Sequence, residues 1–190
     1  MILMTGVPVV AQECSTLQGA SPNDLVSHIS RVEPNQKNAS CVAFAIHEIG
    51  NQLYEPAIPI LTKLLDFRWP RDKWQKQRYF PDAPNPADVQ IFPAATALEK
   101  IGKNSLPAVL EAVKAESTSR IARETAVTVW MAIYKNEAPK AVALLKQEAD
   151  RTKDPATRQR VGWAAFKALN WCVPADQAQC QAAVSTTYSK

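Results

Sequence analysis

Glycine is scarce in this sequence, which has 5 glycines, none beside another, against 14 prolines. A phosphate-binding loop or a dinucleotide fingerprint needs several glycines within a few positions, so isolated glycines exclude both. The Gly-x-Ser-x-Gly turn of serine hydrolases is also absent, and no serine or cysteine has a histidine partner that the sequence would place beside it. We therefore expect no catalytic centre and no cofactor.

Cysteine is also sparse, and the 4 residues include no Cys-x-x-Cys pair, so we expect no metal site. Two cysteines lie near the start of the chain and two near its end. This distribution favours two disulfides, Cys14–Cys41 and Cys172–Cys180, that staple the terminal segments. The alternative is four reduced thiols, with Cys41 and Cys172 as small core residues.

No stretch approaches the ~20 apolar residues of a membrane span. The longest uncharged apolar stretch is Met1–Ala11, which ends in Val9-Val10-Ala11, a pattern that resembles a signal-peptidase site. We expect residues 1–20 to comprise a signal-peptide remnant and an N-terminal arm, and the protein to be periplasmic or secreted. If the stretch is instead an apolar tail that packs on the first helix, a cytoplasmic location follows.

Apolar residues recur at helical spacing through the rest of the chain. Ala94, Ala97, Leu98 and Ile101 form one stripe, which ends at Gly102, and a second stripe follows from Leu106 to Val113. An earlier pair of segments matches this one. Residues 42–50 correspond to 94–102 at an offset of 52, with Gly50 expected to end its helix. The helices that follow correspond at an offset of 48. A helix with one apolar stripe needs neighbours to cover it.

Helix-start signals mark further units of the same kind. Ser21 precedes Pro22 and lies three residues before Asp24, which predicts a capped first helix. Asn136 is a candidate cap for a helix over 138–149, the partner of a helix over 122–133. Asp154 before Pro155 predicts the next start.

The segments Ala45-Ile46-His47-Glu48-Ile49-Gly50, with Pro59, and Ala97-Leu98-Glu99-Lys100-Ile101-Gly102, with Pro107, resemble the bacterial HEAT-like repeat consensus. The clear match covers residues 41–67 and 91–117, with looser cover to about residue 172. The resemblance implies an all-α fold, a short right-handed α-solenoid of about four helical hairpins over residues 21–184. HEAT-like arrays mostly serve as binding scaffolds.

Two enzyme families with HEAT-like helices are excluded by residues that are missing. Deoxyhypusine hydroxylase holds two irons with several His-Glu pairs, whereas His47-Glu48 is the one such pair here. HEAT-like DNA glycosylases carry a tryptophan and basic residues around a groove, which Trp163, Arg158 and Arg160 resemble. No catalytic aspartate accompanies them, and Trp163 lies beside the apolar stripe, so we expect it to pack.

The insertion at residues 68–90 separates the two best-matched units. Its first thirteen positions hold five basic and four aromatic residues, a composition unlike plain disorder. One interpretation is a recognition loop that grips its target by charge and stacking. The other is structural, with the aromatic rings folded back over the helix ends. The loop candidates are Arg68, Trp69, Arg71, Lys73, Trp74, Arg78 and Tyr79.

The sequence as a whole predicts a non-catalytic scaffold that binds another protein in an exported compartment. The alternative is a polyanion or nucleic-acid binder that uses the Arg68–Phe80 loop. The mild net charge of +4 permits an anionic polymer without requiring one, and export makes nucleic acid a less natural target. On the groove lined by the second helices, the polar candidates are Lys63, Asp66, Glu111 and Lys114.

Overall fold

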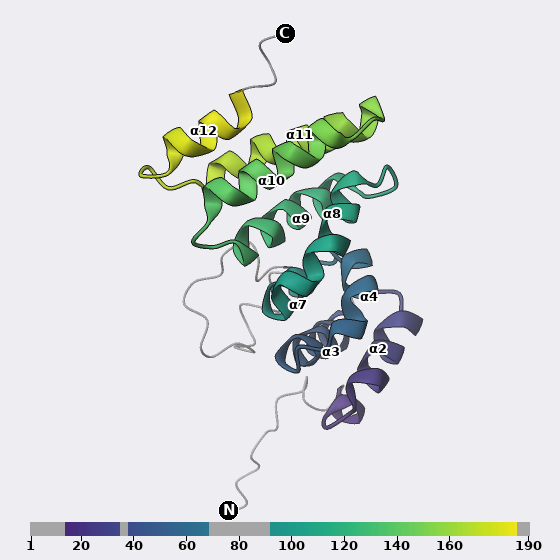
Figure 1. The fold of residues 1–190 in the computed structure, drawn as a ribbon. Helices are drawn as coiled ribbons and strands as arrows, with labels where there is room; N and C mark the ends of the chain where they lie inside the picture. Colours follow the sequence, from purple (N-terminus) through teal and green to yellow (C-terminus); the bar gives the residue numbers. More distant parts are fainter. Residues whose placement is uncertain (1–13, 35–37, 69–91, 186–190) are drawn as a thin grey trace, which may run out of the picture.

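The computed structural model describes residues 14–34, 38–68 and 92–185, and within these ranges every regular element is a helix. The helices follow one another along an elongated molecule, from α2 at one end to α12 at the other (Figure 1). None of the described helices is both long and apolar enough to cross a bilayer. The α-helices are α2 (Pro22–Arg31), α3 (Ala39–Asn51), α4 (Ile58–Lys63), α7 (Pro93–Ile101), α8 (Leu106–Lys114), α9 (Arg120–Ile133), α10 (Ala138–Arg151), α11 (Pro155–Ala168) and α12 (Gln177–Ser185), with 3-10 turns η1 (Ser15–Leu17), η2 (Glu55–Ala57), η3 (Gly102–Ser105) and η4 (Leu169–Trp171).

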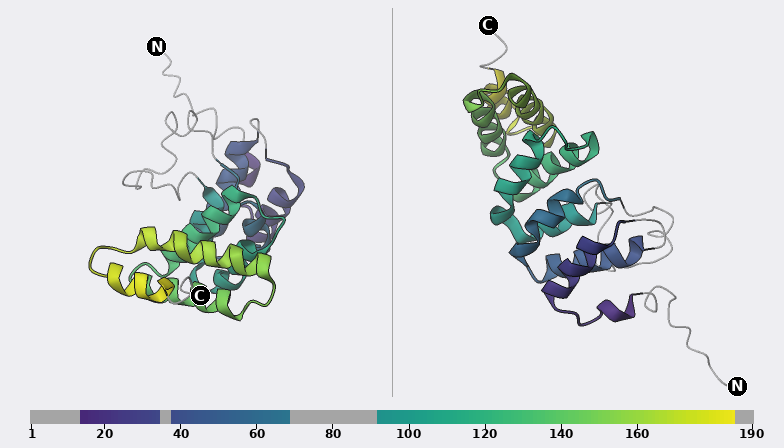
Figure 2. Two further views of the ribbon diagram at one scale, coloured as in Figure 1. Left: turned by 90° about the horizontal axis from the view of Figure 1, so that it is seen from above. Right: turned by 90° about the vertical axis from the view of Figure 1, so that its right-hand side faces the viewer.

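Packing between helices runs along the stack, as the two further views also show (Figure 2). Helix α3 packs on α2 and α7, α7 packs on α9, and α8 packs on both α9 and α11. Helices α10 and α11 form the most extensive pair, whereas α9 touches α10 only lightly. The expected pairing of residues 122–133 with 138–149, which corresponds to α9 with α10, is therefore less extensive than the packing of α10 on α11. An apolar stripe requires a covering neighbour but does not specify which one.

Polar contacts between successive parts of the stack join residues at a recurring sequence separation. Lys100 Nζ donates to Asn51 Oδ1 and Asn104 Nδ2 to Glu55 Oε1, each at 2.6 Å and across 49 residues. Ser119 Oγ donates to Asp66 Oδ2 at 2.8 Å, across 53 residues. The two contacts across 49 residues join the segments that match in sequence, whereas Ser119–Asp66 joins the first of these segments to the start of α9.

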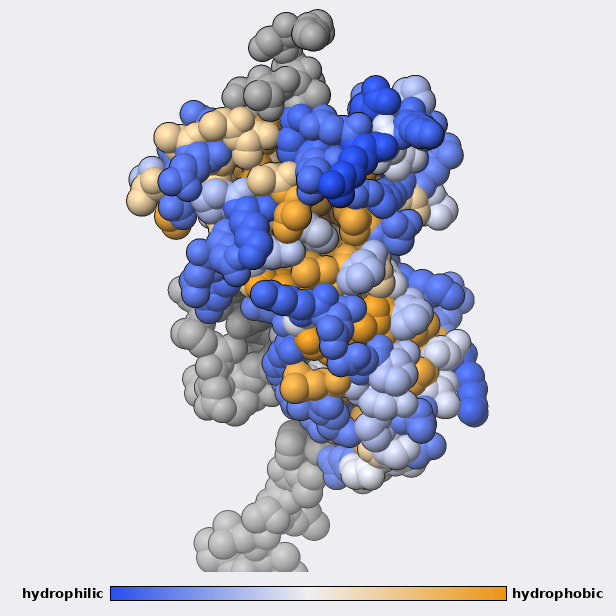
Figure 3. Space-filling view, in the orientation of Figure 1, coloured by the Kyte–Doolittle hydropathy of each residue, from blue (hydrophilic) through white to orange (hydrophobic). Residues whose placement is uncertain are grey.

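The interior is built from small and medium apolar side chains on the predicted stripes. Ile49 is fully buried, and its sequence equivalent Ile101 packs partly exposed against the same core. On the face shown in Figure 3, apolar residues come to the surface along the middle of the molecule between hydrophilic ones.

Gly50 does not end its helix, contrary to the sequence-based expectation, because α3 continues to Asn51. Its role is close packing, since a Cβ added at Gly50 would lie 2.8 Å from the Cα of Ala97 on α7. Gly102 has φ +79° and does end α7, as expected. The two glycines that match in sequence therefore have different physical roles.

Helix α3 instead reverses at Leu53, which has φ 50°. The Leu53 N–H donates to the carbonyl of Gly50, and the Tyr54 N–H donates to the carbonyl of Ile49, both at 3.2 Å. This pair of bonds defines a Schellman motif, whose left-handed position is ordinarily glycine. A leucine at that position is strained by contact between its Cβ and the backbone.

The helix starts agree with two of the three predicted caps. The Ser21 hydroxyl accepts a hydrogen bond from the Asp24 N–H, and the Asp154 carboxylate accepts one from the Thr157 N–H. Asn136 is not a cap, because α10 begins after Glu137, whose side chain makes no capping bond. Pro139 already removes one of the N–H groups that a cap would satisfy.

The two expected disulfides are present. Cys14 is bonded to Cys41, which ties η1 to α3, and Cys172 is bonded to Cys180, which ties the end of η4 to α12. Each bond closes a terminal segment onto its neighbour, as the sequence distribution predicts. The proposed signal remnant at 1–11 lies outside the described residues, as does nearly all of the insertion.

Candidate functional site

The four predicted groove residues do not act together. Lys63 is exposed at the end of α4, and Asp66, just beyond it, accepts the Ser119 hydroxyl at the start of α9. Glu111 and Lys114 form an ion pair of 3.0 Å on α8. The structure therefore brings two of the four into one cluster, and it gives Asp66 a bridging role between α4 and α9.

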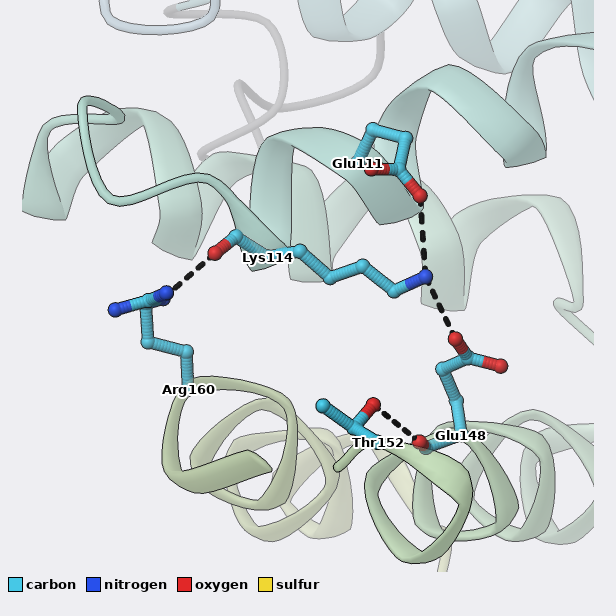
Figure 4. A network of polar contacts seen from close by, with 5 residues as sticks. All are labelled: Glu111, Lys114, Glu148, Thr152 and Arg160. Carbon is cyan, nitrogen blue, oxygen red and sulfur yellow. Dashed lines mark hydrogen bonds and ion pairs between the residues drawn. The ribbon is translucent and has the colours of Figure 1, made fainter. Parts of the chain in front are cut away.

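Lys114 is the centre of a polar junction between three helices (Figure 4). Its ammonium lies between Glu111 on its own helix and Glu148 on α10, at 2.6 Å from the latter. Its backbone carbonyl accepts a hydrogen bond of 2.6 Å from Arg160 Nε on α11. The junction also includes Thr152, whose hydroxyl donates to the carbonyl of Glu148. Lys114 thus joins the end of α8 to both helices of the following pair.

The electrostatics of this junction favour a charged lysine. The hydrogen bond to Glu148 raises the pKa of Lys114 above its ordinary value, burial opposes that rise, and Glu111 adds to it. The lysine has two carboxylate partners, so its ammonium is already neutralised inside the protein. A binding partner would have to displace one of them, which makes Lys114 a structural residue rather than a free contact.

Arginines satisfy the carbonyl groups at the end of α8. Arg123 on α9 donates through Nε to the Val113 carbonyl at 3.1 Å and through Nη2 to the carbonyls of Ala115 and Thr118, at 2.9 and 3.0 Å. Arg160 serves the Lys114 carbonyl from the other side. The last carbonyls of a helix lack partners within it and form the negative end of its dipole. The two guanidinium groups therefore stabilise this helix end by both charge and hydrogen bonding.

An open pocket lies beside these arginines, between α9 and α11. Its volume is about 320 Å³. Three of the five lining residues are arginines, and none is acidic. Arg120, in the first turn of α9, pairs only with Glu124 in the described structure, and its side chain is 83% exposed. The lining residues are Arg120, Arg123, Gln159, Arg160 and Trp163.

Sequence reasoning missed Arg120, Arg123 and Gln159, and it set Arg160 and Trp163 aside. A usable signal was present, because Arg120 and Arg123 are three residues apart, as are Arg160 and Trp163. That spacing places each pair on one helix face. The two pairs face each other only because α9 packs against α11. That packing cannot be predicted from a local sequence pattern.

Among the predicted loop residues, only Arg68 is described, and its guanidinium lies 5.7 Å from the centre of the Phe92 ring. That contact joins the two ends of the insertion region, where described structure stops and resumes. Trp69, Arg71, Lys73, Trp74, Arg78 and Tyr79 lie outside the described residues.

Chemically, the pocket can supply fixed hydrogen-bond donors, positive charge and one aromatic wall. Such a set suits binding of an anion that carries an apolar group. Compared with models of protein families, with curated proteins and with solved structures, the chain matches none of them.

Proposed function

We propose that this protein is a non-catalytic scaffold that binds another protein in an exported compartment. In this proposal its helices form a short right-handed α-solenoid of the HEAT-like kind. The observation that carries the binding role is the open pocket of Arg120, Arg123, Gln159, Arg160 and Trp163. Arginine and tryptophan are the residues most enriched among the energetically dominant contacts of protein interfaces.

Support for the repeat architecture comes from the contacts between the two segments that match in sequence. Lys100 on α7 donates to Asn51 at the end of α3, and Asn104 in η3 donates to Glu55 in η2. In a repeat array each unit contacts mainly its neighbours, and the long exposed surface is available for binding. Support for export comes from the two disulfides, since such bonds persist in oxidising compartments.

The test is affinity capture from the native host with the wild-type chain and matched variants. Arg120→Glu reverses a charge in the pocket at an exposed side chain. Arg31→Glu makes the same change at an exposed position at the end of α2, far along the stack. We expect a defined partner that the wild type and Arg31→Glu capture and that Arg120→Glu loses. Equal capture by all three would contradict the assignment of the pocket.

A further variant separates the pocket from the insertion. Trp69→Ala combined with Trp74→Ala removes both tryptophans of the insertion and leaves the pocket intact. If the pocket is the binding site, this double variant captures the same partner as the wild type. Loss of capture, with helical content unchanged by circular dichroism, would move the binding site to the insertion.

A further inference from the structure

We propose that the pocket between α9 and α11 takes a carboxylate group of an acidic peptide segment, next to an apolar side chain of the same segment. This inference rests on the proposed function, because it names the chemistry of the partner at the same site. It is supported by three features of the pocket: donors held in place, an aromatic wall and a limited positive surface.

The donors are held in place because the arginines are anchored by the protein itself. Arg123 uses Nε and Nη2 on backbone carbonyls, and Arg160 uses Nε on a carbonyl and Nη2 on the Thr157 hydroxyl. In the described part of the chain, the Nη1 group of each has no hydrogen-bond partner. An anchored guanidinium loses little further freedom when it binds a carboxylate, so its remaining donors bind at small entropic cost.

One wall of the pocket is aromatic, because the Trp163 side chain lines it. Phe166, three residues further along α11, is 58% exposed. Lys167 Nζ lies 5.7 Å from the centre of the Trp163 ring, which adds another positive charge beside the aromatic wall. Exposed large apolar residues beside charged ones are typical of a contact surface for a protein segment.

The positive surface is too limited for a long polyanion. The volume of about 320 Å³ accommodates a side chain or two rather than a continuous backbone. Glu124 is paired with Arg120 at the border, and Glu148 lies across the Lys114 junction. These carboxylates would repel the successive phosphates of a nucleic acid. An isolated carboxylate carries a single charge, so it meets less of this repulsion than a series of phosphates does.

The test is a nuclear magnetic resonance titration of the full chain with acetyl-Leu-Glu-Leu-Glu-amide and with its Gln analogue, acetyl-Leu-Gln-Leu-Gln-amide. The readout is the indole N–H signal of Trp163, identified by its loss in Trp163→Phe. We expect saturable movement of this signal by the Glu peptide and binding about tenfold weaker for the Gln peptide, because charge-assisted hydrogen bonds are lost. Raising NaCl from ~50 to ~300 mM should weaken binding, since Arg120 is exposed to solvent.

Variants locate the site. Arg120→Gln removes an exposed guanidinium that holds no backbone carbonyl, so the fold is retained and the Glu peptide should bind about threefold to tenfold more weakly. Arg31→Gln, the matched control at the end of α2, should leave binding unchanged. Equal affinity for the Glu and Gln peptides, or an unmoved indole signal at millimolar Glu peptide, would overturn the inference.

A single-stranded oligonucleotide, octathymidylate, serves as the competing ligand class. Stronger binding of this probe than of the Glu peptide, at the same indole signal, would also overturn the inference and would make a phosphate polymer the ligand. The proposed function fails separately, because it depends on the capture experiment with Arg120→Glu. A partner captured through the pocket without response to either peptide would leave the scaffold role standing and remove the carboxylate chemistry.

Discussion

Leu53 is the one non-glycine residue with a positive φ in the described structure, and it forms the reversal after α3. Its side chain is 57% exposed, so little apolar burial depends on it. The Schellman bonds made by the N–H groups of Leu53 and Tyr54 require the backbone conformation but not the leucine side chain. The leucine side chain can therefore be replaced, whereas the left-handed backbone conformation at this position must be kept.

Replacing Leu53 with glycine is expected to stabilise the protein by about 1 kcal/mol, because the contact between Cβ and backbone in the left-handed conformation is removed. Urea unfolding monitored by circular dichroism measures the change. Leu53→Ala is the matched control, since it shortens the side chain but keeps the Cβ, and it should not gain this stability. A gain of the same size in the alanine variant would assign the effect to the exposed side chain.

Gly50 presents the opposite case, a position where the backbone is ordinary and space is absent. Alanine would bring a Cβ to 2.8 Å from the Cα of Ala97, and backbone cannot move aside as a side chain can. We expect Gly50→Ala to destabilise the protein by about 1–2 kcal/mol in urea unfolding, after about 1 kcal/mol of helix propensity is gained. Neutral or improved stability would show that α3 and α7 can separate without loss.

The lowered pKa of His47 predicts that stability depends on pH. Burial lowers the pKa of its imidazole, and the positive charge of Lys100 lowers it further against the opposing effect of Glu48. Because the folded pKa is below the ordinary histidine value of 6.5, the unfolded chain takes up this proton first as pH falls. The free energy of unfolding should therefore decline as pH drops below about 6.5 and reach its lower level below the folded pKa. His47→Gln should remove this component in paired urea titrations at pH 7.5 and ~5, and an unchanged slope would contradict it.

At the scale of elements, the end of α8 depends on side chains from other helices. Arg123 alone serves three backbone carbonyls from α9. No residue of α8 itself supplies these bonds, so α8 and α9 stabilise each other through this contact. Removal of the Arg123 guanidinium takes this donor away from the carbonyls of Val113 and Thr118, while Ala115 keeps only the bond of 3.4 Å from the Thr118 N–H.

Arg123→Met keeps the apolar stem of the side chain and removes its donors. We expect a loss on the order of 2 kcal/mol in the free energy of unfolding. Arg120→Met, one turn earlier on the same helix, removes only an exposed ion pair with Glu124 and should change stability by less than about 0.5 kcal/mol. Similar losses in both variants would show that general charge, rather than the carbonyl contacts, accounts for the effect.

The sequence predicted the helices well and their neighbours less well. Apolar spacing and first-turn prolines located the helices, because both are local properties of the chain, and Ser21 and Asp154 cap as their positions indicate. The packing of α10 on α11 rather than on α9 is determined by tertiary structure, because the apolar stripes of these helices are similar in sequence. The pocket was missed for the same reason, since Arg123 and Trp163 become neighbours only through the packing of α9 and α11.

At the scale of the whole molecule, the two disulfides close both ends of the stack. The bridged residues are separated by 27 positions in Cys14–Cys41 and by 8 in Cys172–Cys180. Loop-closure entropy predicts stabilisation of at most about 3.5 and about 2.5 kcal/mol, respectively. The larger effect belongs to the N-terminal bond because it removes more freedom from the unfolded chain.

Separate double variants, Cys14→Ala with Cys41→Ala and Cys172→Ala with Cys180→Ala, test this order by thermal unfolding under oxidising conditions. The first pair should lower the melting temperature more than the second. The intact wild-type protein should also be lighter than its fully reduced form by the mass of about four hydrogens. Four thiols that react with an alkylating agent in the native protein would contradict both bonds.

The disulfides at both ends change where local unfolding of the molecule begins. A linear stack ordinarily frays from its tips, where each helix has a neighbour on one side only. Here disulfides link both terminal segments to their neighbours. We therefore expect local unfolding to begin inside the molecule, at the six-residue helix α4 and its contacts with α7 and α8. Among the helices, hydrogen exchange should then be fastest in α4 rather than in α2 or α12.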